Sequence, residues 1–135
     1  MNEKGSITLW LLGAMMTILV VGLFATEVSV ASATRRTVAA VADSAATQAA
    51  SHVVIDSAGT GEPRIDVERA TDAAVDAAHA HPLWSSAMTV EVSATPTEVA
   101  VRVATPRQGG PLMNLVGAAD QSAIATGRAQ PQTSR

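Results

Sequence analysis

The stretch Gly5–Thr26, GSITLWLLGAMMTILVVGLFAT, decides the fold because it contains no charged residue. As an α-helix with a rise of about 1.5 Å per residue, it would be about 33 Å long. That length matches the roughly 30 Å hydrocarbon core of a bilayer. Trp10 lies near the first edge of the stretch, where aromatic rings settle at the level of lipid headgroups. The sequence therefore predicts a transmembrane helix over residues 6–26, with the lipid bilayer as a partner.

Two other interpretations of this stretch remain open. Ala31-Ser32-Ala33 has the form of an A-x-A signal-peptidase site, and cleavage after Ala33 would release a secreted, soluble binding protein. The apolar region is longer than the 7–15 residues or so of a signal peptide, and Glu27 separates it from that site. A buried core helix is the weaker alternative. Positive charge does not settle the orientation, because Lys4 lies on one side of the stretch and Arg35 on the other.

The composition of residues 27–54 predicts that the helix continues through them, outside the bilayer. They include no proline or glycine and are rich in alanine, a strong helix former. Residues at three- and four-residue spacing form one narrow face there, namely Val38, Val41, Ala45, Ala49 and His52. Such a face suits close packing against other elements. Two glycines and a proline in Asp56–Pro63 then predict a loop.

A second helix is expected over Ile65–Ala80, within a small α+β domain that covers residues 55–129. Asp66 lies in its first turn, near the positive end of the helix dipole, and His79 lies in its last. Pro82 follows and ends the helix.

Alternating valines predict a β-hairpin after this helix. Apolar residues occupy every second position over residues 88–92 and again over residues 99–103. If Thr95–Glu98 forms the loop, Val92 faces Val101 and Glu91 faces Arg102. All valines then share one side, and an ion pair lies on the other.

The rest of the chain gives weaker signals. Gln121–Ala129 is expected to add a third strand, after a loop over Pro106–Gly110 and a short apolar turn over Leu112–Val116. Residues Gly127–Arg135 are expected to fray, with a disordered tail over residues 130–135.

Composition excludes several classes of protein. The chain has 12 acidic and 9 basic residues and a net charge of −3, which disfavours nucleic-acid binding. It contains no cysteine, so thiolate catalysis and Cys-ligated metals are absent. Alanine contributes 27 of the 135 residues and large apolar side chains are scarce beyond Thr26, so the aqueous part has a thin core. A rigid enzyme is therefore not expected.

The residues that could carry chemistry do not form a convincing site. His79 and His81, with Asp76 nearby, suggest a metal, but residues two apart on a helix face apart and only His52 is left to add a ligand. No metal site is predicted.

A nucleophilic or nucleotide site is not predicted either. Ser57, Asp56 and His52 include the residue types of a triad, but no G-x-S-x-G elbow is present. Gly59-Thr60-Gly61 lacks the Gly-Lys-Ser/Thr of a phosphate loop and is more plausible as a hinge. No cofactor or small-molecule substrate is expected.

Two further features each have two interpretations. The pair Arg35 and Arg36 is favoured as a solvated helix face, with contact to lipid headgroups as the alternative. Trp84 is favoured as part of the core between helix and sheet rather than as an exposed anchor for a partner.

The chain resembles Flp pilus-assembly proteins of the TadE/TadG-like type, which are related to type IV pilin-like proteins. The resemblance rests on the start Glu3–Gly13, EKGSITLWLLG, on Arg35–Ala46, RRTVAAVADSAA, and on the valine hairpin. It covers most of the chain but is specific only across about the first fifty residues. The richness in alanine also suggests a high-GC, actinobacterial source.

The resemblance implies a short charged leader over residues 1–5, with a prepilin-peptidase site between Gly5 and Ser6. It further implies a cytoplasmic N-terminus, a single-pass anchor in the cell membrane and an extracytoplasmic C-terminal domain. Pilin-like proteins usually carry glutamate at the fifth position after the cleavage point, and that position here is Trp10. The charge that would pair with the amino terminus of a neighbouring subunit is thus missing, which disfavours a polymerising pilin.

The function expected from the resemblance is structural. The chain would be an accessory or minor pilin-like component of a Tad-type pilus-assembly and secretion system, with other Tad/Flp proteins as partners and prepilin peptidase as a further one. Gly13 and Gly22 are the expected helix-packing positions, because glycine allows close backbone approach in lipid.

Overall fold

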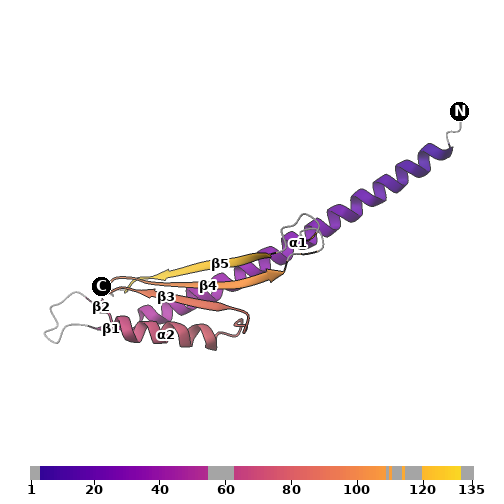
Figure 1. Cartoon of the computed structure of the whole chain (residues 1–135). Coiled ribbons are helices and arrows are strands. Elements are labelled where there is room, and N and C mark those ends of the chain that lie inside the picture. Colours follow the sequence, from indigo (N-terminus) through magenta and orange to yellow (C-terminus); the bar gives the residue numbers. More distant parts are fainter. Residues whose placement is uncertain (1–3, 55–62, 109, 111–113, 115–119, 132–135) are drawn as a thin grey trace.

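The structure is a computed structural model of the whole chain and describes residues 4–54, 63–108, 110, 114 and 120–131. It has the predicted α+β fold, with one very long helix, a second helix and small antiparallel sheets. Figure 1 shows the long helix α1, Lys4–Ala50, projecting far beyond the domain that packs against its C-terminal half. At about 1.5 Å per residue, its 47 residues are about 70 Å long.

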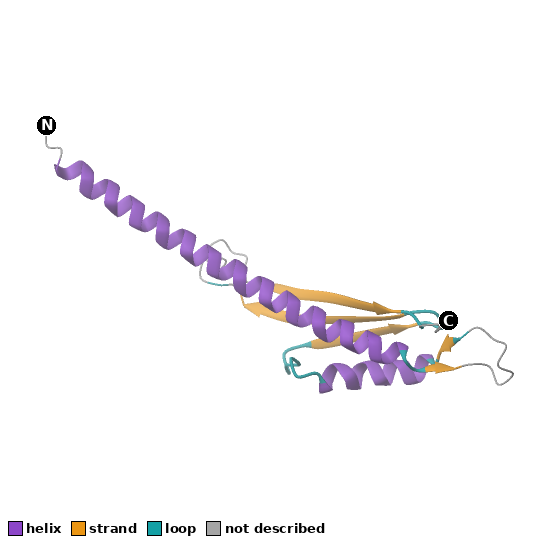
Figure 2. Ribbon diagram, turned by 180° about the vertical axis from the view of Figure 1, so that it is seen from behind, coloured by secondary structure: helices purple, strands orange, loops and turns teal. Residues whose placement is uncertain are grey.

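The domain has two layers, helices on one side and a three-stranded sheet on the other. The sheet has the order β3-β4-β5, with β3 at Thr89–Ala94, β4 at Val99–Gln108 and β5 at Asp120–Ala129. The second half of α1 packs against β4 and β5, and α2, Val67–Ala80, packs against α1 and β3. In Figure 2 α1 passes in front of the sheet, and α2 runs beside α1 near β3.

The core is built almost entirely from alanine and valine. The buried α1 residues are Val38, Val41, Ala42, Ala45, Ala46, Ala49 and Ala50. They meet three buried alanines of α2, Ala70, Ala74 and Ala78, and three buried valines of β4, Val99, Val101 and Val103. Small side chains let the helices and the sheet approach closely, which is how a chain with few large residues closes a core.

The hairpin has the predicted register. Val92 pairs with Val101 and Glu91 with Arg102, so the valines face the helices and the charged pair faces outward. The Arg102 Nη1 and Glu91 Oε2 atoms are 3.9 Å apart, and both side chains are more than half exposed. The predicted third strand is confirmed as β5, which pairs with β4 along its whole length.

One predicted loop lies partly in a strand, and one segment predicted to fray is a strand as well. Pro106, expected in a loop with Arg107, lies in β4, where it pairs with Ser122. β3 begins opposite Ala104, so beyond that point β4 borders β5 and no other described strand. A proline is tolerated at such an edge because its missing N–H removes no bond from the ladder on that side. The predicted fraying from Gly127 is also wrong, because β5 runs to Ala129.

Both helices are shorter than predicted. α1 ends at Ala50 rather than at residue 54, and Val53–Val54 forms β1 instead. β1 pairs with β2, Arg64–Ile65, which delays the start of α2 from Ile65 to Val67. Asp66 caps α2, because its carboxylate accepts a hydrogen bond from the Arg69 backbone N–H at 3.3 Å.

Several sequence predictions lie outside the described residues. These are the leader over residues 1–3, the loop over residues 55–62, most of the apolar turn over Leu112–Val116 and the tail over residues 132–135.

Candidate functional site

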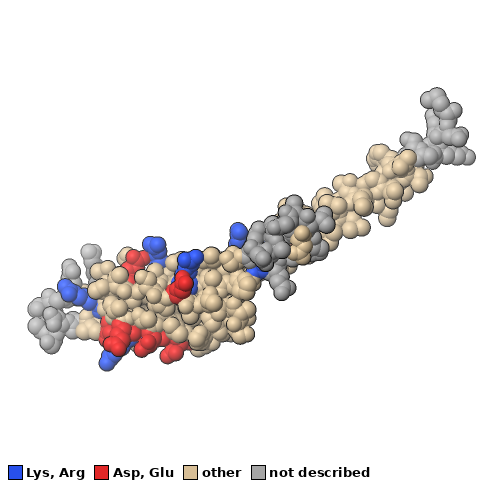
Figure 3. Space-filling view, in the orientation of Figure 1, with Lys and Arg blue, Asp and Glu red and all other residues tan. Residues whose placement is uncertain are grey.

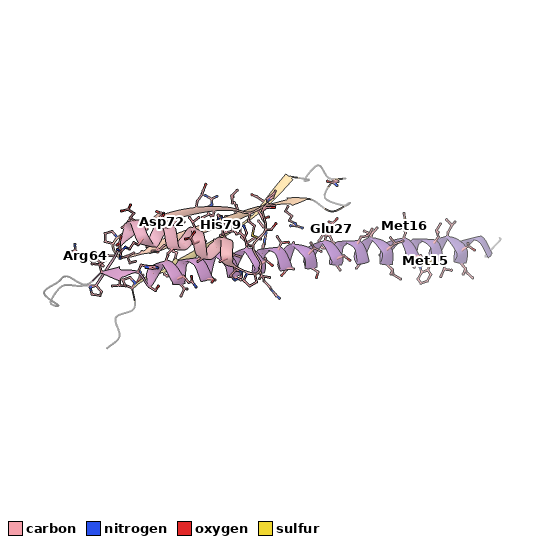
Figure 4. All side chains as sticks on the ribbon, turned by 90° about the horizontal axis from the view of Figure 1, so that it is seen from below. Met15, Met16, Glu27, Arg64, Asp72 and His79 are labelled. Carbon is pink, nitrogen blue, oxygen red and sulfur yellow. The ribbon has the colours of Figure 1, made fainter. Side chains whose placement is uncertain are left out.

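The N-terminal half of α1 presents large apolar side chains to its surroundings on every side. Trp10 is 76% exposed and Phe24 is 60% exposed, and Met15 and Met16 project from α1 far from the domain in Figure 4. Figure 3 shows no charged side chain along this half where it is described. Soluble monomeric proteins rarely expose an apolar surface of this size, which is typical of a site of interaction with lipid or protein. This one helix of the described chain is long and apolar enough to cross a membrane.

Two threonines of this half satisfy their hydroxyl groups within the helix. Thr17 Oγ1 donates to the Gly13 carbonyl oxygen at 2.9 Å, and Thr26 Oγ1 donates to the Gly22 carbonyl oxygen at the same distance. Satisfied hydroxyl groups remove the main cost of placing threonine in a hydrocarbon phase. The surface of this half of α1 is therefore almost purely apolar.

The two predicted packing positions, Gly13 and Gly22, both have open space around them. A Cβ atom built on either residue would meet no heavy atom within 4 Å. Beside Gly13 lies a shallow hollow on the helix surface, lined by Leu9, Trp10, Ala14, Thr17 and Ile18. The two glycines are nine positions apart, so at about 100° per residue they point to opposite sides of the helix. One partner helix cannot contact both.

The predicted processing site lies at the beginning of α1. Gly5 and Ser6 both have helical backbone, one and two residues after the helix begins at Lys4. Trp10, the fifth residue counted from Ser6, is highly exposed. The position that carries glutamate in pilin-like proteins is therefore an apolar surface position here.

Where the projecting half of α1 meets the domain, the end of β4 is fastened to the helix. Arg107 Nη2 donates to the Glu27 backbone carbonyl oxygen at 3.4 Å. Gly110 lies so close to Glu27 that a Cβ atom on the glycine would collide with the carboxylate. These contacts fix the strand end at the first charged residue after the apolar stretch. Sequence reasoning missed Arg107, because it placed this residue in a loop.

The described residues that could have formed a metal or nucleophilic site have structural roles or do not come together. His79 packs against Trp84 with ring centroids 4.6 Å apart, and His81 Nδ1 accepts a hydrogen bond from the Leu83 N–H at 3.2 Å. Within the described ranges no group of three or more His, Asp or Glu residues is placed to hold a metal ion. His52 is exposed. Asp56, Ser57 and Gly59–Gly61 lie outside the described residues.

Trp84 is half-buried and packs against the core cluster, as the core interpretation predicts. Arg35 and Arg36 are exposed on α1, between the core and the apolar stretch.

Comparison with protein families, with curated proteins and with solved structures finds no match to this chain.

Proposed function

We propose that this chain is a membrane-anchored, structural subunit of the pilin-like kind, serving as an accessory or minor component of a Tad-type pilus-assembly and secretion system. The observation that carries the proposal is the double use of α1. Buried residues from Val38 onward contribute to the domain core, while Ile7–Thr26 project as an exposed apolar helix. An N-terminal helix that anchors the chain in the membrane and carries the rest of the chain outside it is the arrangement that the resemblance to TadE/TadG-like proteins implies.

Lateral packing of α1 is the proposed mode of action. Because Gly13 and Gly22 lie on opposite sides, the helix can accept one neighbouring helix on each side at two different depths. Close approach at glycine is favourable in lipid, where packing rather than the hydrophobic effect drives helices together. An exposed Trp10 in place of a charged residue suits a subunit that joins an assembly without neutralising another subunit's amino terminus.

The N-terminus of the mature protein tests this proposal most directly. Mass spectrometry of membrane and secreted fractions from the native host should find a chain that starts at Ser6 in the membrane. An intact N-terminus in the membrane would remove prepilin-type processing and leave an unprocessed anchor. A mature chain that starts at Thr34 in the secreted fraction would refute the proposal.

Replacing Gly13 with leucine should weaken association with Tad partners. The new side chain fills the hollow beside Thr17 and keeps a partner backbone at a distance, so co-purification from mild detergent should fall severalfold. Val21→Leu is the matched control, since it enlarges an exposed side chain without closing a glycine site. Unchanged co-purification of both Gly13→Leu and Gly22→Leu would contradict the packing model.

The second candidate, a secreted binding protein released after Ala33, is favoured by one observation. Every buried residue of α1 follows Ala33, so cleavage there leaves the alanine and valine core intact. The shape of α1 counts against this candidate, because the helix runs without interruption through the proposed cleavage site at Ala31–Ala33. The same mass measurement separates the two candidates.

A further inference from the structure

A cavity of about 400 Å³ opens beside α1 at the level where the helix leaves the domain. Its lining combines apolar and basic side chains. Phe24 and Val28 supply apolar surface, and Arg35, Arg36 and Arg107 supply three guanidinium groups. Glu27 also lines the cavity.

Arg107 lies in the wall of this cavity, and only part of its guanidinium group is hydrogen-bonded. Its Nη2 group donates to the Glu27 carbonyl oxygen, which fixes the guanidinium beside α1. Its Nε atom is buried and has no hydrogen-bond partner among the described residues. Buried donors in proteins are almost always satisfied, so this N–H needs an acceptor that the described chain does not supply.

The position of the cavity along the axis of α1 matches the headgroup layer of a bilayer. Glu27 is the first charged residue after the apolar stretch, so it lies at the boundary of the hydrocarbon core. Arg35 follows about 12 Å farther along the axis. Side chains on a helix lean toward its N-terminus, which carries the Arg35 and Arg36 guanidinium groups back toward the membrane. The polar layer of a bilayer extends roughly 5–8 Å beyond the hydrocarbon on each side.

We propose that this cavity binds the phosphate group of one anionic membrane phospholipid, with an acyl chain against Phe24 and Val28. Guanidinium groups bind phosphate oxygens in a bidentate manner, and three of them outweigh the single Glu27 carboxylate. The excess positive charge disfavours a headgroup that carries its own cation, such as choline. The inference rests on the membrane anchoring of the proposed function.

Lipid titration of the full-length chain tests the inference. The wild type, Arg107→Gln and Arg35→Gln are purified in detergent and titrated with phosphatidylglycerol, and native mass spectrometry counts the lipids bound. One phosphatidylglycerol per wild-type chain is expected, with the dissociation constant raised about fivefold for each arginine removed. Phosphatidylcholine should bind more weakly. Arg102→Gln is the matched control, because Arg102 lies on the outer face of the sheet.

Each result decides the matter. Equal binding of phosphatidylglycerol by the wild type, Arg107→Gln and Arg35→Gln would overturn the inference. Should Arg107→Gln lose its circular-dichroism spectrum, Arg35→Gln alone decides, because the exposed Arg35 side chain takes no part in the core. Saturation by sodium phosphate without binding of phosphatidylglycerol would identify a soluble anion as the ligand and refute a lipid site.

A separate measurement keeps this inference distinct from the proposed function. All variants are first reconstituted into liposomes and washed with alkaline carbonate. Loss of the wild type from the liposomes would refute the anchor itself. Retention of the wild type together with arginine-independent lipid binding would refute the phosphate site alone.

Discussion

At the scale of single residues, Gly127 is where β5 rests directly on the backbone of α1. A Cβ atom added there would collide with the Ala42 carbonyl group and come within 2.7 Å of the Asp43 nitrogen. Both obstacles are backbone atoms of a helix, which cannot rotate aside as a side chain can. Only glycine allows this strand to lie so near the helix.

Gly127→Ala should therefore destabilise the fold by about 1–3 kcal/mol, the range typical of overpacking. Thermal unfolding of the full-length chain in detergent, followed by circular dichroism, measures the change. Gly22→Ala is the control, because a Cβ atom there meets nothing within 4 Å. An unfolding midpoint for Gly127→Ala equal to that of the wild type would show that β5 does not lie against Ala42.

The sequence could not reveal this role of Gly127. Glycine near the end of a chain ordinarily indicates a loop or a frayed tail, and that was the prediction made from it. The reason for glycine here is a contact with Ala42, 85 residues earlier, which no local pattern encodes. Arg107 and its cavity were missed for the same reason, because their partners lie on α1.

At the scale of elements, the hairpin was the most predictable part of the molecule. A shift of one residue would turn Val101 outward and Arg102 inward, so burial and charge select the same register. The extension of β4 through Pro106 was not predictable, since proline normally ends a strand. It depends on how far β3 reaches along β4, which is a property of the sheet rather than of the residues around Pro106.

The two faces of the hairpin should respond very differently to substitution. Val101→Ala removes a fully buried side chain from the centre of the core and should cost about 2 kcal/mol of unfolding free energy. Glu91→Gln removes a charge from an exposed pair and should change the free energy of unfolding by less than about 1 kcal/mol. Chemical unfolding of both variants checks this contrast. Similar losses in the two variants would argue against the observed register.

At the scale of the whole molecule, α1 divides into a half that the domain needs and a half that it does not. The buried residues of the helix begin at Val38, and the large apolar side chains of Ile7–Thr26 are exposed. The length and apolar character of the first half were evident from the sequence. The burial of the second half required the sheet, because its alanines alone do not indicate what covers them.

A chain that starts at Thr34 should consequently be soluble and folded, with the circular-dichroism signal of helix and sheet and a cooperative unfolding transition. A chain that starts at Val41 is the control, because it lacks Val38, one of the largest fully buried side chains of the core. That shorter chain should unfold at a clearly lower temperature or not fold. Aggregation of the chain that starts at Thr34 would show that the apolar half also supports the domain.

The unbroken course of α1 also has a mechanical consequence. No proline interrupts the helix between Lys4 and Ala50, and the domain is packed onto its last turns. In the proposed anchored state the helix is a stiff lever whose pivot lies in the bilayer. Anchors tilt to match bilayer thickness, and a tilt of about 10° around the middle of the apolar stretch would move the far end of the helix by roughly 9 Å. The thickness of the surrounding membrane would thereby set the orientation of the domain and its distance from the bilayer surface when it meets its neighbours.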